Sequence, residues 1–313
     1  MRALVTGGAG FIGSHLVDAL VEDGNEVVVL DNFVTGRREN LADAAKLVEG
    51  DVADPDHVAR AVAGCELVFH QAALGSVARS VARPLDTDRA NVHGTLAVLS
   101  AAQQAGIQRV VLASSSSVYG GATQVPTPET VPLMPRSPYA VTKLTDEHYA
   151  RVFWELHGLE TVCLRYFNVY GPRQRPDSEY AAVIPRFIAA LVGRTPPEVH
   201  GDGRQSRDFT FVADAVQANL RAATAPPEAC AGHAYNVARG QPHDLLELLD
   251  ILAEQLGASV EARHIGSRPG DLRHSHADVS AAQHDLGYEP QVSFHDGLAR
   301  TVDWFTSREG NGG

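Results

Sequence analysis

Cysteine is scarce in this 313-residue chain, which has only Cys65, Cys163 and Cys230, far apart in the sequence. Their spacing matches no cysteine-based metal site, and it favours a reducing cytoplasm over a disulfide-stabilised exterior. The pair His274 and His276 lacks a third ligand at metal-binding spacing. We therefore expect no metal.

Basic charge and long apolar runs are also missing. The net charge is −12 with neutral histidines, which excludes general binding to nucleic acid or an acidic membrane. No apolar run is long enough to cross a bilayer, and Met1 leads straight into a core-like strand rather than a signal peptide. An anionic substrate would need local arginines. With 44% apolar residues, the chain can bury one large core or two joined ones.

A glycine-rich turn near the N-terminus predicts a dinucleotide site. Residues 2–6 are a short apolar run, residues 7–13 read GGAGFIG, a helical pattern follows, and residues 26–31 are a second apolar run that ends in an acid. Strand, glycine turn, helix and strand form a βαβ unit, whose turn places phosphate at a helix N-terminus.

Each position in this turn has a physical reason. Gly7 permits the tight turn, Gly10 lets the backbone approach a pyrophosphate, and Gly13 lets the helix pack close to the strand. Asp31 can accept hydrogen bonds from the adenosine ribose, which favours NAD over NADP, although residues 37–38 are both arginine.

The βα pattern continues through the first half. Residues 46–49, 66–70, 109–113 and 160–167 are expected strands, and residues 91–105 an expected helix. Asp51 and Val52 follow one strand and can contact adenine, although Asp51 can alternatively cap a helix. The small Ala72 and Ala73 would let a cofactor lie over the strand ends. We predict an α/β fold: a Rossmann-type doubly wound parallel sheet in residues 1–168, and a smaller C-terminal α/β substrate-binding part in residues 169–313.

A row of serines at 114–117 follows the strand at 109–113. Ser137 and Pro138 are good N-cap and N1 residues, so Tyr139 and Lys143 should share one face of the first helical turns. Alone, this pair would suggest an interfacial tyrosine and a solvated lysine. Combined with the glycine turn and the serines, it indicates catalysis.

These motifs resemble the extended short-chain dehydrogenase/reductase family, especially its nucleotide-sugar epimerases, from Val5 to about Trp304. The resemblance rests on TGGAGFIG at 6–13, SSSSVYG at 114–120, YxxxK at 139–143, LRYFN at 164–168, RDF at 207–209 and RPGD at 268–271.

The resemblance implies catalytic roles. Tyr139 would be the general base on the sugar 4-hydroxyl, Lys143 would favour its phenolate and hold the nicotinamide ribose, and Ser115 would bond the 4-oxygen. Hydride transfer from C4 to NAD would leave a 4-keto sugar, and its return to the other face would invert C4.

The resemblance also implies binding residues. Those expected for NAD are Gly7, Gly10, Phe11, Ile12, Gly13, Asp31, Asn32, Asp51, Val52, Ala72, Ala73, Asn91, Ser114, Tyr139, Lys143 and Tyr166. Those expected for the substrate are Ser76, Ser115, Ser116, Asn168, Val183, Arg207, Arg268, Asp271 and Ser275. Alternatives stay open at three kinds of position: Asn168 could serve a turn, the arginines could be surface residues, and Asp271 could simply pair with Arg273.

The expected function is NAD-dependent 4-epimerisation of a UDP-sugar. Ser275 stands where epimerases restricted to glucose and galactose often carry tyrosine, so N-acetylated sugars should be tolerated. Alternatives are a nucleotide-sugar 4,6-dehydratase, an epimerase of UDP-glucuronic acid, and a silent NAD-binding sensor. Serine at 116 and 117, where the dehydratases carry acids, disfavours the first. We also expect a homodimer formed by helices at 91–105 and 139–156.

Overall fold

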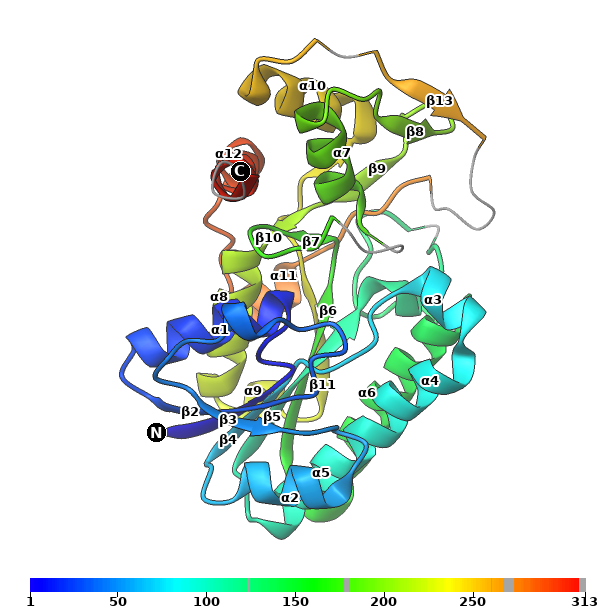
Figure 1. The fold of residues 1–313 in the computed structure, drawn as a ribbon. Helices are drawn as coiled ribbons and strands as arrows, with labels where there is room; N and C mark the ends of the chain where they lie inside the picture. The colour runs from blue at the N-terminus through cyan, green and yellow to red at the C-terminus, as the bar shows by residue number, and fades with distance from the viewer. Residues whose placement is uncertain (123, 177–180, 260, 267–272, 310–313) are drawn as a thin grey trace.

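A single parallel sheet organises the structure. The computed structural model describes residues 1–122, 124–176, 181–259, 261–266 and 273–309. Within them, seven strands pair in the order β11-β6-β5-β4-β1-β2-β3 (Figure 1). Their bounds are β1 Arg2–Thr6, β2 Glu26–Asp31, β3 Lys46–Glu49, β4 Leu67–His70, β5 Arg109–Ser115, β6 Glu160–Tyr166 and β11 His233–Val237. This is the Rossmann order with one added strand, so the predicted fold class is confirmed.

Helices cover both faces of the sheet, which explains why its strands are apolar on both sides. Ala3 and Val5 point to one face, where α1 and α8 pack, and Leu4 points to the other, where α2, α5 and α6 pack. The helices of this part are α1 Phe11–Glu22, α2 Pro55–Val62, α3 Val77–Ala82, α4 Pro84–Asp88, α5 Gly94–Gln104, α6 Pro138–His157, α8 Val212–Thr224, α9 Pro227–Cys230 and α11 Ser280–Leu286, with short turns η1 Arg38–Asn40 and η3 Ser116–Tyr119. No helix in the described ranges combines the length and apolarity needed to cross a membrane.

The helix predicted at 91–105 begins differently from expectation. A π-helical turn, η2 Arg89–His93, precedes α5. A π turn holds an extra residue, and Asn91 lies within it, fully buried. The sequence does not reveal this turn, because the apolar residues of α5 recur at the spacing of an ordinary α-helix.

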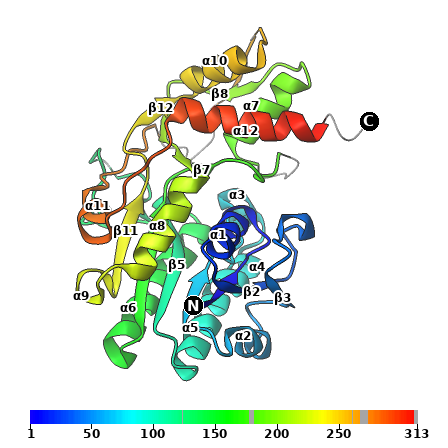
Figure 2. The ribbon, with the colours of Figure 1, turned by 90° about the vertical axis from the view of Figure 1, so that its left-hand side faces the viewer.

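A smaller part lies beyond the carboxyl ends of the strands (Figure 2). Its helices pack around a second core of Ile184, Leu248 and Leu298. Its elements are α7 Val183–Val192, α10 Leu245–Leu256, α12 Phe294–Glu309, and the paired strands β7 Val169–Tyr170 with β10 Thr210–Phe211, β9 Ser206–Asp208 with β12 Pro242–Asp244, and β8 Glu198–His200 with β13 Arg263–Ile265. The division at residue 168 stays a prediction, and β11 from the later half completes the sheet.

Candidate functional site

A cleft of about 860 Å³ runs over the carboxyl ends of the sheet strands. Of the sixteen residues predicted to bind NAD, all but Asn91 line it: Gly7, Gly10, Phe11, Ile12, Gly13, Asp31, Asn32, Asp51, Val52, Ala72, Ala73, Ser114, Tyr139, Lys143 and Tyr166. Strand ends are where doubly wound sheets bind ligands. The fold therefore gathers residues from six strand ends around one space.

The glycine turn fits a dinucleotide phosphate. Gly7 has a positive φ of 68°, and its amide donates to Leu30 O at 2.8 Å. A Cβ on Gly13 would lie 2.2 Å from Gly7 O, so only glycine allows α1 to start this close to the turn. Gly10 is the N-cap and supplies no side-chain acceptor. The first N–H groups of α1 are thus left for an anion.

Asp31 is buried at the end of β2. Its two carboxylate oxygens accept from the amides of Ala9 at 3.0 Å and Phe33 at 2.8 Å. Burial raises the pKa of Asp31, and these two amide bonds oppose the shift.

The neighbouring arginines are already paired. Arg38 bonds Glu49 and stacks over Phe33, and Arg37 lies 3.2 Å from Glu39. The 2′-phosphate of NADP would have to compete with these carboxylates for the two arginines. The cleft wall at the end of β2 therefore fits NAD better than NADP.

The wall that is predicted to face adenine carries an ion pair that sequence reasoning missed. Asp51 accepts from Ala53 N at 2.9 Å and lies 3.2 Å from Arg89 of η2. Arg83 and Arg89 line the same wall of the cleft. No local pattern points to them, because both arginines are far from Asp51 in the sequence.

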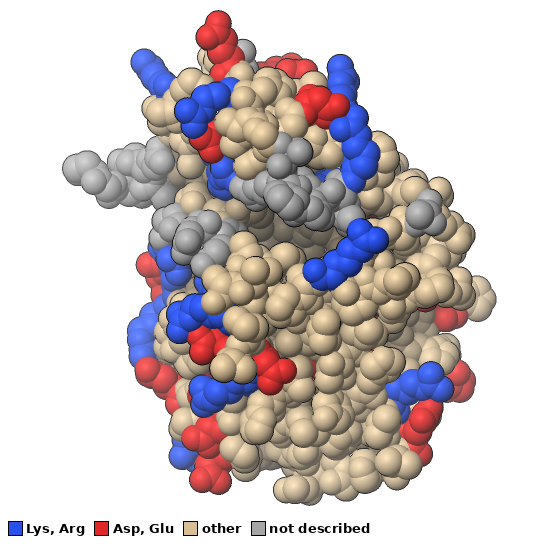
Figure 3. Space-filling view, turned by 90° about the vertical axis from the view of Figure 1, so that its right-hand side faces the viewer, with Lys and Arg blue, Asp and Glu red and all other residues tan. Residues whose placement is uncertain are grey.

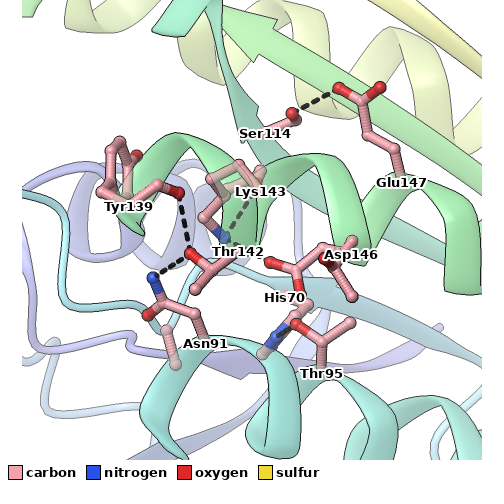
Figure 4. A network of polar contacts seen from close by, with 12 residues as sticks. His70, Asn91, Thr95, Ser114, Tyr139, Thr142, Lys143, Asp146 and Glu147 are labelled. Atoms are coloured by element: carbon pink, nitrogen blue, oxygen red, sulfur yellow. Dashed lines mark hydrogen bonds and ion pairs between the residues drawn. The ribbon is translucent and has the colours of Figure 1, made fainter. Parts of the chain in front are cut away.

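Two of the catalytic candidates, Tyr139 and Lys143, lie in the first turns of α6 (Figure 4). Ser137 caps this helix by accepting from Ala140 N at 3.1 Å, as predicted. Tyr139, Lys143 and Ser115 all line the cleft. The Lys143 side chain is 2% exposed, and its Nζ donates to Ala113 O at 3.0 Å and to Asp146 Oδ2 at 2.9 Å.

Asn91 and Ser114 are placed as supports of the cleft. Asn91 Oδ1 accepts from Leu74 N at 2.8 Å, and its Nδ2 donates to Thr142 Oγ1 at 2.9 Å. Asn91 thus ties the segment after β4 to α6 without lining the cleft. Ser114 lines it, but its hydroxyl donates to Glu147 Oε1 at 2.5 Å.

Two further polar groups, His70 and Tyr166, are buried next to the cleft. His70 is fully buried between Thr6 Oγ1 at 2.7 Å and Thr95 Oγ1 at 2.9 Å. Burial, helped by the charge of Lys143, lowers the pKa of His70 to about 3. His70 is therefore a neutral hydrogen-bonded residue. Tyr166 OH accepts from Asn219 at 2.7 Å, and burial raises the pKa of Tyr166 to about 12.

A second cavity of about 250 Å³ adjoins the first. Three predicted substrate residues, Asn168, Val183 and Arg207, line it, and Asn168 lines both cavities. Asn168 has a positive φ of 37° and donates to Asp208 O at 3.1 Å. Asn168, whose backbone is strained, therefore stands between the cleft that Tyr139 lines and the cavity that Arg207 lines.

Of the remaining predicted substrate residues, the three that the structure describes line neither cavity. Ser76 caps α3 by accepting from Arg79 N at 3.2 Å, Ser116 lies in η3, and the Ser275 amide donates to Ser206 O at 3.1 Å. Arg268 and Asp271 lie outside the described residues. The binding roles of all five stay predictions.

Comparison with known proteins gives a consistent result. Residues 3–238 match the family described as "NAD dependent epimerase/dehydratase family". The UDP-glucose 4-epimerase of Mycolicibacterium smegmatis is 41% identical over 98% of this chain and 99% of its own length.

Two solved structures share the whole fold. The UDP-glucose 4-epimerase of Thermotoga maritima, determined with UDP-glucose, superposes with a TM-score of 0.95 at 37% identity over 99% of this chain and 100% of that one. The UDP-N-acetylglucosamine 4-epimerase of Methanobrevibacter ruminantium, determined with UDP-N-acetylmuramic acid, gives 0.92 at 39% identity over 98% of each chain.

These matches confirm the predicted resemblance, the assignment to the epimerase class of enzymes and the choice of NAD as cofactor. The glycine turn, the buried acid at the end of β2, and the cleft over the strand ends supply the matching geometry. The chain belongs to the NAD dependent epimerase/dehydratase family.

Proposed function

We propose that this protein inverts C4 of UDP-sugars and accepts N-acetylated as well as plain hexoses. The observation that carries the proposal is the junction at Asn168, where the cleft holding Tyr139 adjoins the cavity lined by Arg207. An extended ligand can place a sugar carbon beside the phenol and a diphosphate beside the guanidinium. Arginine suits the second task because its planar donors pair with phosphate oxygens.

The chain's own groups carry the proton steps. Tyr139, as phenolate, takes the proton of the sugar 4-hydroxyl, Ser115 bonds the 4-oxygen, and Lys143 supplies the positive charge that stabilises the phenolate. NAD, when held in this cleft, would supply the acceptor for the C4 hydride and the donor for its return. After the 4-keto sugar turns over, Tyr139 gives the proton back to the 4-oxygen. Substrate and product have the same composition, so no external oxidant is consumed.

The carboxylates of the cleft argue against dehydration. Among its described lining residues they are Asp31, Asp51 and Asp86, and Asp31 and Asp51 are the residues predicted to contact the adenosine. At positions 116 and 117, where the dehydratases carry acids, this chain has two serines in η3, which cannot act as carboxylates. Elimination of water across the sugar C5 and C6 therefore has no acid at the matching positions.

The substrate test is a mass-resolved panel of UDP-glucose, UDP-N-acetylglucosamine and UDP-glucuronic acid with the purified protein. We expect C4 epimers of the first two and no mass change. In the Ser275→Tyr variant, conversion of UDP-N-acetylglucosamine should fall at least tenfold while UDP-glucose turnover persists. If no UDP-hexose is inverted, the function is wrong. If Ser275→Tyr slows both sugars equally, only the role of Ser275 is wrong.

We further propose a homodimer that buries the outer faces of α5 and α6. Val141, Val152 and Leu156 of α6 are exposed, at 42–73% of their surface, as are Val81 and Leu85 of the adjoining α3 and α4. Figure 3 shows a broad face with few charged side chains on this side of the molecule. Exposed apolar surface of this kind marks association sites. Light scattering at micromolar concentration should give twice the chain mass, and Leu156→Glu should give the monomer; a monomeric wild-type protein would refute the dimer.

The cytoplasm remains our proposed location. Cys65, Cys163 and Cys230 are all buried and unpaired, as expected for thiols in a reducing compartment. Fractionation of producing cells, with the protein recovered outside the cytoplasmic fraction, would contradict it.

A further inference from the structure

A second charge lies against the catalytic lysine. Asp146 follows Lys143 by three residues on α6, so the two side chains share a helix face. Asp146 Oδ2 accepts from Lys143 Nζ at 2.9 Å, and the exposed fractions of the two side chains are 3% and 2%. Figure 4 shows both side chains on α6, further along the helix than Tyr139. Asp146 and the Ala113 carbonyl oxygen, 3.0 Å from Nζ, accept two of the three ammonium N–H groups of Lys143. The third N–H is left for a ligand in the cleft, which Lys143 lines.

Burial and charge act on Lys143 in opposite directions. Burial lowers the pKa of Lys143, but Asp146, then Tyr139 and Cys163, raise it, and the net pKa lies above the ordinary value for lysine. Without a counterion, a fully buried lysine tends to lose its proton near neutral pH. The protonation state of Lys143 thus depends on the charged groups next to its ammonium group.

The other groups near Lys143 do not replace Asp146. On β4, His70 is neutral because burial lowers its pKa to about 3. On β6, burial raises the pKa of the Cys163 thiol, which stays protonated. Glu147, next to Asp146 on α6, is bound by both Nε and Nη2 of Arg165 at 2.9 and 2.7 Å. Among the described residues, Asp146 is the carboxylate that bonds Lys143.

We propose that Asp146 is a positioning residue for the epimerase reaction: it keeps Lys143 protonated and fixes the direction of its free N–H. This inference rests on the proposed function only for its effect on turnover. The charge pair itself can be tested without any substrate.

The sequence offers a direct probe, because Lys46 and Lys143 are its only two lysines. Protein labelled with ¹³C at lysine Cε gives one signal from each, and Lys46, on an exposed strand position, serves as an internal reference. In the wild-type protein, the Lys143 signal should stay that of the ammonium form up to strongly alkaline pH. In Asp146→Asn, whose side chain has the same shape, we expect its midpoint to fall by at least about one pH unit.

The alkaline limb of the rate–pH profile should move down with this midpoint, because turnover needs protonated Lys143. Asp146→Ser is a second variant in case the amide disturbs packing. Glu155→Gln is the matched control, because it removes a carboxylate from the same helix, where Glu155 pairs with exposed Arg151 at 2.7 Å. It should change neither the Lys143 titration nor the rate–pH profile.

The outcomes are distinct. An unchanged Lys143 titration in both Asp146 variants overturns the proposal, and so does a shifted titration with an unchanged rate profile. A wild-type protein that inverts no UDP-sugar refutes the proposed function instead, and the lysine titration then decides on the charge pair by itself.

Discussion

The buried ion pair between Glu147 and Arg165 allows a sharp test of how α6 is held on the sheet. The Glu147 carboxylate accepts from Arg165 Nε at 2.9 Å, from Arg165 Nη2 at 2.7 Å and from Ser114 Oγ at 2.5 Å. Both charged side chains are less than 10% exposed. Glu147→Gln keeps the shape of the side chain but places an amide N–H₂ against the guanidinium, so one bond is lost and the charge of Arg165 stays buried without a counterion.

Removing one partner of a buried pair costs about 3–5 kcal/mol, because the remaining charge keeps its desolvation penalty. We expect Glu147→Gln to lower the free energy of unfolding by this amount in urea titrations of NAD-free protein. Glu155→Gln is the matched control, since the same substitution on the same helix touches only the exposed pair with Arg151 and should cost about 0.5 kcal/mol or less. A loss below about 1 kcal/mol in Glu147→Gln would refute the reasoning, as would equal losses in the two variants.

Three further predictions concern the cleft. Tyr139→Phe should lower turnover by at least about 10²-fold while NAD binding, followed by calorimetry, persists; unchanged turnover would remove Tyr139 from the reaction. Gly13→Ala should abolish NAD binding, since its Cβ would lie 2.2 Å from Gly7 O, whereas Gly266→Ala meets nothing within 4 Å and should bind normally; normal binding by both would contradict the fit of the turn. His70, with its pKa lowered to about 3, stabilises the fold above pH 6.5, and this contribution is lost as pH falls towards 3. Unfolding free energies should therefore fall more steeply with acid in the wild-type protein than in His70→Asn, by about 1.4 kcal/mol per pH unit, and parallel slopes would contradict the assignment.

Local patterns were sufficient to predict the Rossmann part. Gly7, Gly13 and Asp31 act through the backbone and the strand end next to them, so their spacing alone predicts their placement. Ser137 caps its own helix, and Lys143 follows Tyr139 by one turn, which fixes both on one face.

Pairings between distant segments could not be predicted in the same way. Asn91 bonds Leu74 and Thr142 only because a π turn aims it inward, and Arg89 meets Asp51 across the cleft wall. Asp146 shares a helix with Lys143, but i,i+3 spacing by itself describes many solvated pairs. Its significance appears only once both side chains are buried.

The central claim is that one hydrogen leaves C4 of a UDP-sugar and returns to the same carbon on the other face. The most direct measurement is incubation of the protein and NAD with UDP-glucose deuterated at C4, with the product read by mass spectrometry and NMR. The account predicts the C4 epimer, unchanged in mass, with deuterium still on C4. Absence of the epimer, loss of the label to solvent, or a product lighter by one water would contradict it.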